Sequence, residues 1–151
     1  MSTNKKAYER DKSRNFDPTG GSSGGDGEGD IIWVGSTDVS SGRVYYLTEV
    51  EGTLSWAQSD ASAESTSSNL LAVALGTGAA NEVGMLLRGM VHMAAGLSDG
   101  TIGQPIFLST TAAQVTNTSP TGTGDIVRIV GNQMGTNKLW FNPDNTYIKL
   151  S

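Results

Sequence analysis

A serine within a glycine-rich pentapeptide is the first group in the sequence that could do covalent chemistry. Ser98 stands in Gly-Leu-Ser-Asp-Gly (96–100), which matches the G-x-S-x-G pattern of the nucleophile elbow in α/β-hydrolases. In that fold a helix follows the serine, and the catalytic histidine comes last along the chain. Here no helical pattern follows Gly100, and the only histidine, His92, precedes the serine. The sequence therefore predicts an ordinary turn at this pentapeptide.

Few other side chains could support acid–base or metal chemistry. The chain has one histidine and no cysteine, so it has no thiolate nucleophile, and a metal site would need mostly carboxylate ligands. His92 lies in an apolar run beside Met90 and Met93, where we expect a histidine at the edge of a strand face or at a subunit contact. The sequence therefore predicts no catalytic residue, no metal site and no cofactor.

Three carboxylates at alternate positions, Asp26, Glu28 and Asp30, form the one acidic motif on a glycine-rich stretch. Hard cations such as Ca²⁺ favour oxygen ligands on loops of this kind. However, the EF-hand pattern lacks its closing glutamate, and the G-G-x-G-x-D repeat is not met. A solvated linker is the default expectation, and cation binding by these three residues stays open.

A second glycine-rich stretch, Gly-Thr-Gly-Ala-Ala-Asn (76–81), begins like a dinucleotide-binding loop. It ends in asparagine, and neither a helical pattern nor a βαβ unit follows it. No nucleotide site is predicted there.

Two arginines, Arg88 and Arg128, each interrupt an apolar run. A long charged side chain in such a place must reach solvent or a carboxylate. Two interpretations fit this placement: an ion pair across a subunit interface, and an exposed strand face.

The elements that must position these residues are short strands. The chain has 20 glycines, 36% hydrophobic residues and 17% charged residues, and its apolar residues come in short bursts between Gly, Ser, Thr and Asn. This pattern is typical of strands and turns. The predicted strands are Ile31–Val34, Arg43–Thr48, Thr53–Ala57, Leu70–Leu75, Met85–Met93, Pro105–Leu108, Gln114–Thr116, Ile126–Val130, Leu139–Phe141 and Tyr147–Leu150. We therefore expect an all-β fold, a compact sandwich or barrel of about ten short strands.

Several positions within this pattern carry sharper expectations. Leu70–Leu75 is uniformly apolar, which predicts a strand buried on both faces, and Asp60–Asn69 could form one helical turn. Gly89, inside an otherwise strong strand pattern, predicts a bulge or a close backbone approach. The Pro-containing stretch Phe141–Asn145 predicts a turn between the last two strands. The aromatic residues of the domain are expected in the core or at subunit contacts.

Residues 1–30 differ from the rest and are predicted to be an irregular N-terminal arm with a glycine-rich linker, ahead of a β-domain at 31–151. Residues 1–14 carry five basic and two acidic side chains, a net charge of +3, whereas the acidic residues prevail in 15–151. Half of residues 19–30 are glycine. Such a segment buries too little apolar surface to offset its conformational entropy, so alone it is expected to be disordered. A basic tip suits a segment that reaches an acidic partner surface, or one that simply stays solvated.

Within the arm, Tyr8 and Phe16 are the only aromatic residues, and Arg10 and Arg14 stand near them. Aromatic and arginine side chains often carry the binding energy of protein interfaces. These four residues are predicted to anchor the arm on a partner protein.

The charge and hydropathy patterns argue against two classes of partner. The net charge of −5 is unfavourable for a protein that binds nucleic acid with its whole surface. No run approaches the length of a membrane-spanning helix, and the polar start MSTNKKAYERDKSRNF lacks the apolar core of a secretory signal. We expect a protein made in the cytoplasm of its cell, without nucleic-acid or membrane partners.

Four stretches of the chain carry a resemblance: WAQSDASAESTSSNLLAVALGT, GMLLRGMV, GQPIFLSTTAAQVTNTSPTGTGDIVRIVG and LWFNPDNTYIKL. Their order and their turns resemble the β-rich modules of virion structural proteins in tailed bacteriophages, especially marine and cyanobacterial ones. The resemblance covers residues 54–151 and leaves out the arm. Such modules occur in capsid decoration proteins and in head or tail fibre proteins. They carry no catalytic residues to transfer, and they commonly trimerise.

The resemblance implies a structural protein of the virion. A capsid decoration (cement) protein is the first expectation: a homotrimeric β-domain whose arms bind the major capsid protein, or another virion protein. The alternative is a short head or tail fibre, spike or knob component, in which the arm attaches to the virion and the β-domain contacts the host. A single short module with its own arm favours decoration. An enzyme is the weakest expectation, because the chain lacks cysteine and the Ser98 motif lacks its context.

Overall fold

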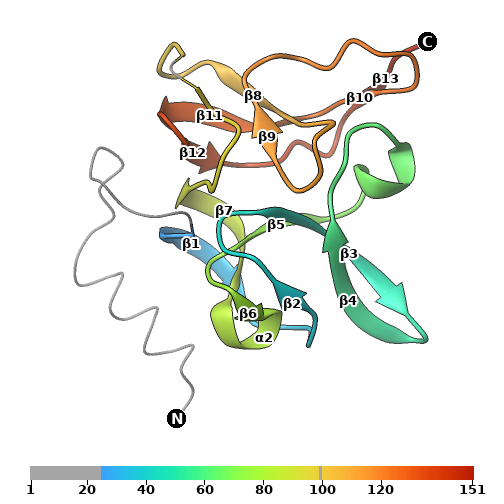
Figure 1. Ribbon diagram of the computed structural model, residues 1–151, viewed down its shortest axis with the longest axis vertical. Coiled ribbons are helices and arrows are strands. Elements are labelled where there is room, and N and C mark those ends of the chain that lie inside the picture. Colours follow the sequence, from blue (N-terminus) through green and yellow to red (C-terminus); the bar gives the residue numbers. More distant parts are fainter. Residues whose placement is uncertain (1–24, 99) are drawn as a thin grey trace.

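The computed structural model describes residues 25–98 and 100–151, which form a β-rich body (Figure 1). Its elements are β1 (Gly27–Ile32), β2 (Asp38–Val39), β3 (Val44–Val50), β4 (Thr53–Gln58), η1 (Glu64–Thr66), β5 (Leu71–Ala74), β6 (Gly78–Ala79), α2 (Ala80–Val83), β7 (Met85–His92), β8 (Pro105–Leu108), β9 (Val115–Thr116), β10 (Ile126–Val127), β11 (Ile129–Gly135), β12 (Lys138–Phe141) and β13 (Ile148–Lys149). The main sheet runs β4-β3-β5-β7-β12-β11-β8-β9, and β1 pairs with β7. This antiparallel sheet curls into a half-barrel, which confirms the predicted all-β class.

Each of the ten predicted strands has a counterpart, with ends shifted by a few residues. Two-residue strands β2 and β6, which pair with each other, were not predicted, and the predicted strand 126–130 is divided into β10 and β11. The four-residue helix α2 begins within the glycine-rich stretch 76–81, where no helix was expected. The 3-10 turn η1 lies within 60–69, where one helical turn was expected.

β1 begins at Gly27, within the segment predicted as linker. Its residues pair with β7, Gly29 opposite Gly89, with a register shift between Asp30 and Ile31, and the Gly25 amide donates to the His92 carbonyl at 2.7 Å. The two glycines face each other at positive φ, and a Cβ on Gly89 would lie 2.8 Å from the Gly29 Cα and overlap the Glu28 carbonyl. The predicted close backbone approach at Gly89 is confirmed. Glycine is needed at positions 29 and 89 because β1 and β7 approach too closely there for a side chain on either residue.

The core consists of two apolar clusters that share strands β3 and β5. Leu71 and Val73 of β5 join the larger cluster, whereas Ala72 and Ala74 join the smaller one. Successive side chains of a strand point to opposite faces, so β5 is buried on both sides, as the sequence predicted. The smaller cluster is completed by residues from β2, α2 and the strands around them, including Val39, Tyr45, Trp56, Ala80 and Met85.

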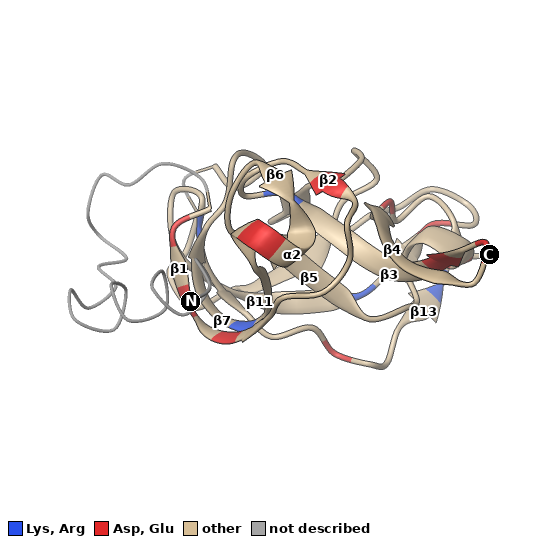
Figure 2. Cartoon of the chain, turned by 90° about the horizontal axis from the view of Figure 1, so that it is seen from below, with Lys and Arg blue, Asp and Glu red and all other residues tan. Residues whose placement is uncertain are grey.

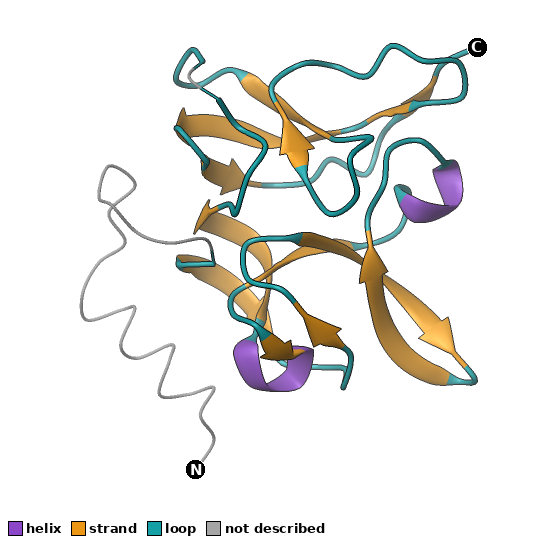
Figure 3. Ribbon diagram, in the orientation of Figure 1, coloured by secondary structure: helices purple, strands orange, loops and turns teal. Residues whose placement is uncertain are grey.

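Loops carry much of the chain between the C-terminal strands (Figure 3). The expected turn after β12 is present, since residues 142–147 contain no strand or helix. The C-terminal strand is tied to η1, because the Tyr147 hydroxyl hydrogen-bonds the Glu64 carboxylate and the Lys149 Nζ lies 3.9 Å from it. The hydrogen bond to Glu64 raises the pKa of Tyr147, since it stabilises the protonated phenol.

Acidic side chains are spread over several elements of the body, including β2 and α2, instead of gathering over one (Figure 2). No helix in the described part of the chain has the length and apolar character needed to cross a membrane.

The glycine pair between β1 and β7 gives a first test. Gly89→Ala is expected to lower the free energy of unfolding by about 2–4 kcal/mol, because the new Cβ must displace the backbone of β1. Gly52→Ala is the matched control: Gly52 also has a positive φ, but a Cβ there meets nothing within 4 Å, so the cost should be about 1 kcal/mol. Urea unfolding of both variants measures the difference, and equal costs would contradict the close approach.

Candidate functional site

The site begins with Arg128, the residue between β10 and β11. Its side chain is 2% exposed, the largest among the fully buried side chains. The guanidinium donates from Nε to the Asp144 carbonyl at 2.6 Å, and from Nη1 to the carbonyls of Ser67 at 2.6 Å and Asn69 at 2.7 Å. Backbone carbonyls from two distant segments therefore satisfy this buried charge.

Neither sequence interpretation of Arg128 was correct. The side chain reaches carbonyl oxygens of its own chain, so it is neither exposed nor in need of a partner subunit. Burial lowers the pKa of Arg128, while the nearby Asp144 and Tyr147 act in the opposite direction. Arg88 differs, since it is exposed, stands opposite Asp30 in register, and lies 5.5 Å from the ring centroid of Trp140.

The loop that follows β12 is held against β11 by main-chain hydrogen bonds. The Asn142 amide donates to the Val130 carbonyl at 2.8 Å, and the Asp144 amide donates to the Ile129 carbonyl at 2.9 Å. The Thr146 amide donates to Asp144 Oδ1 at 2.9 Å, which closes a local turn. Together with the bond from Arg128, these contacts fix the backbone of residues 142–146.

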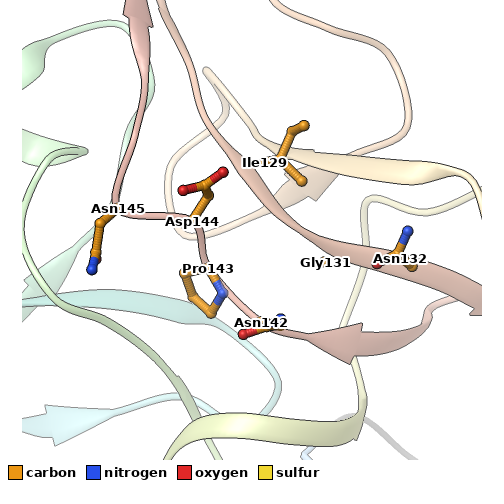
Figure 4. A pocket seen from close by; sticks show the side chains of 7 residues that line it. All are labelled: Ile129, Gly131, Asn132, Asn142, Pro143, Asp144 and Asn145. Atoms are coloured by element: carbon orange, nitrogen blue, oxygen red, sulfur yellow. The ribbon is translucent and has the colours of Figure 1, made fainter.

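Between this loop and β11 lies an open hollow of about 450 Å³, which Figure 4 shows from close by. It is lined by Ile129, Gly131, Asn132, Asn142, Pro143, Asp144 and Asn145. Gly131 keeps a positive φ, and a Cβ on it would overlap the Trp140 carbonyl. The lack of a side chain at Gly131 lets β11 approach β12 and leaves the space between the flanking side chains open.

The groups that face the hollow are amides and one carboxylate. Asn132 Nδ2 donates to the Gly103 carbonyl at 3.0 Å, whereas the side chains of Asn142 and Asn145 make no hydrogen bond within the described residues. The lining contains no lysine, arginine or histidine. Such a set can donate and accept hydrogen bonds, but it offers neither a nucleophile with an adjacent base nor a set of metal-binding carboxylates.

The residues singled out from the sequence lie elsewhere. Ser98 is in a loop, where its hydroxyl accepts from Asn117 Nδ2 at 3.2 Å and its carbonyl accepts from Gln133 Nε2 at 2.7 Å. His92 is 3% exposed at the end of β7, which places it inside the sheet and not at a face edge. The four predicted arm anchors, Tyr8, Arg10, Arg14 and Phe16, lie outside the described residues.

Of the three alternating carboxylates, Glu28 and Asp30 belong to β1, and Asp26 directly precedes this strand. Glu28 lies opposite Met90 and Asp30 lies opposite Arg88, while the Asp26 carbonyl accepts from the His92 amide at 2.8 Å. Within residues 25–98 and 100–151, no group of three or more His, Asp or Glu side chains is arranged to hold a metal ion.

Sequence reasoning missed the hollow, because it treated residues 141–145 only as a turn. One signal was available: three polar side chains follow one another closely on a Pro-containing turn after a buried strand. Asn132 gave no signal, since only the strand register brings it beside that turn.

Comparison with known proteins gives no match of this chain to a family model, to a curated protein sequence or to a solved structure.

The buried guanidinium gives a second test. Arg128→Met should lower the free energy of unfolding by about 2–3 kcal/mol, because the buried carbonyl of Ser67 and the part-buried carbonyls of Asn69 and Asp144 lose a charged donor. Arg88→Met is the matched control, and it should cost about 1 kcal/mol or less, since it removes an exposed cation–π contact. Thermal and urea unfolding measure both. A small change in the free energy of unfolding of Arg128→Met would mean that water hydrogen-bonds the three carbonyls in place of the guanidinium.

Proposed function

We propose that this chain is a structural, non-enzymatic protein of a bacteriophage virion, and specifically a capsid decoration protein that binds the major capsid protein lattice. The observation that carries the proposal is the resemblance of residues 54–151 to β-rich virion modules. The observed all-β half-barrel supports it, because the resemblance implies a compact β-barrel or sandwich.

The N-terminal arm supplies the proposed contact with the capsid. Its first 14 residues carry a net charge of +3, whereas the chain as a whole carries −5. An arm that binds only the assembled lattice stabilises that lattice by mass action, and linked arms of an oligomer add to this through their effective concentration. The arm joins the body at β1, which the backbone pairing with β7 fixes in the sheet.

The β3–β4 hairpin supports self-association, which we propose produces a homotrimer. β4 is the terminal strand of the main sheet and carries no charged residue. Two apolar side chains on this hairpin are exposed, Val50 at 53% and Leu54 at 40%. An uncharged edge strand with exposed apolar residues favours pairing with another chain.

A fibre, spike or knob component is the second candidate, and the hollow beside β11 is the observation that favours it. A polar hollow lined by Asn and Asp side chains suits recognition of a host surface more than attachment to a lattice. In this role the arm attaches to the virion and the β-domain points outward.

The arm gives the test of the decoration role. Tyr8→Ala combined with Phe16→Ala should abolish attachment of the purified protein to capsids that lack it, because the arm loses both aromatic anchors. Ser13→Ala with Asn15→Ala is the matched control in the same segment and should attach like the unaltered chain. Cosedimentation with capsids measures attachment, and circular dichroism checks that the β-domain stays folded. Full occupancy by the aromatic double variant would contradict the arm mechanism.

The number and place of copies in purified particles separate the two candidates. Decoration predicts copies over the whole capsid surface, and a fibre or knob predicts a few copies at one vertex or on the tail. Cryo-electron microscopy of the particle distinguishes these patterns.

The hairpin gives the test of self-association. Leu54→Lys should convert the trimer to monomer, because a lysine on an edge strand opposes pairing with another chain. Thr121→Lys adds the same charge to an exposed loop and should leave the trimer intact. Light scattering after size-exclusion chromatography measures the mass. A monomeric unaltered chain, or a trimeric Leu54→Lys variant, would contradict the contact at β4.

A further inference from the structure

We propose that the hollow between β11 and the loop after β12 is a binding site for a neutral saccharide, which it holds by a pyranose ring with neighbouring hydroxyl groups. This inference goes beyond the virion role and does not depend on it, because it concerns the chemistry of the described surface alone.

Hydrogen-bonding capacity is the first reason. Asn142, Asn145 and Asp144 present amide and carboxylate groups from one short loop, and Asn132 presents a further amide from β11 (Figure 4). The bond from Asn132 Nδ2 to the Gly103 carbonyl holds the Asn132 amide in place, while Asn142 and Asn145 keep both donors and acceptors available within the described residues. Hydroxyl groups donate and accept at once, so adjacent sugar hydroxyls can pair with such planar groups.

Charge restricts the class of ligand. The hollow contains one carboxylate, Asp144, and no basic side chain, so phosphate groups and acidic sugars would be repelled and would lack a counter-charge. A hard cation such as Ca²⁺ usually requires more carboxylate oxygens than one residue provides. A neutral ligand remains favoured.

Apolar surface beside the amides matches the C–H faces of a sugar ring. Ile129 is 41% exposed at one wall of the hollow, and Pro143 adds a ring at another. The C–H faces of a pyranose ring pack on aliphatic side chains, while its hydroxyl edge turns to the amides.

Size and rigidity also fit. The hollow of about 450 Å³ is within the range of roughly 300–1,000 Å³ usual for small-molecule sites. The loop backbone is held by its bonds to Ile129, Val130 and Arg128, so it need not be ordered when the ligand binds. Because the hollow is open, a terminal residue or an internal residue of a longer glycan can enter it.

The experiment titrates the full chain with a panel of neutral monosaccharides, neutral oligosaccharides, sialylated and sulfated sugars, and CaCl₂, followed by NMR and calorimetry. We expect at least one neutral sugar to bind with a Kd of about 1 mM, as suits an open site with few hydrogen bonds. Tighter binding of the oligosaccharide than of its monosaccharide would identify a surface polysaccharide as the natural ligand of the hollow. Equal binding of the two would identify a free sugar as that ligand. A site that prefers acidic sugars, or that binds only Ca²⁺, would overturn the proposal.

Asn142→Ala combined with Asn145→Ala should weaken binding about tenfold. Neither side chain bonds within the described residues, so the fold should be unaffected. Gln58→Ala removes an exposed amide from β4 and serves as the matched control. The proposal fails if no neutral sugar of the panel binds, or if the double variant binds like the control. Both results leave the decoration role untouched, since capsid attachment is measured on the arm, but they would remove the observation that favours the fibre role.

Discussion

The buried guanidinium of Arg128 is the interaction on which the C-terminal half of the structure depends. A buried charge is tolerated only if it is hydrogen-bonded, and here Nε and Nη1 donate to the carbonyls of Asp144, Ser67 and Asn69. These carbonyls belong to the segment after η1 and to the loop after β12. One side chain thus joins two segments that have no shared strand pairing, at the point where the chain passes from β10 to β11.

Glycines set the spacing between neighbouring strands at two places in the main sheet. Gly29 and Gly89 let β1 lie against β7, and Gly131, beside a bulge in the pairing of β11 with β8, lets β11 approach β12. In each place a Cβ would overlap a carbonyl of the neighbouring strand, so the glycine is required by space and not by a turn. The same residue, Gly131, opens the hollow between Ile129 and Asn132.

Local pattern was enough to predict most strands, the burial of β5 and the turn after β12, because these depend on neighbouring residues. Local pattern failed where contacts between residues distant in the sequence determine the structure. The strands β2 and β6 exist only by pairing with each other across the smaller cluster. Arg128 was misassigned since its partners are backbone carbonyls, which every residue has and no pattern marks. Asn142 and Asn145 are ordinary turn-forming residues in the sequence. Only the fold, which places them beside Asn132, makes them line the hollow.

The arm and the body suit different tasks for physical reasons. Residues 1–14 combine positive charge with aromatic and arginine side chains, and they adjoin a glycine-rich stretch, which is the composition of a segment that gains order on a partner. The described body holds its one fully buried charge on its own carbonyls and leaves uncharged amides on a fixed loop. A fixed, weakly polar surface discriminates by shape and hydrogen-bond geometry, whereas a charged arm contributes affinity. If both parts act in one virion protein, the arm determines where the chain is attached, and the body determines what the attached chain contacts.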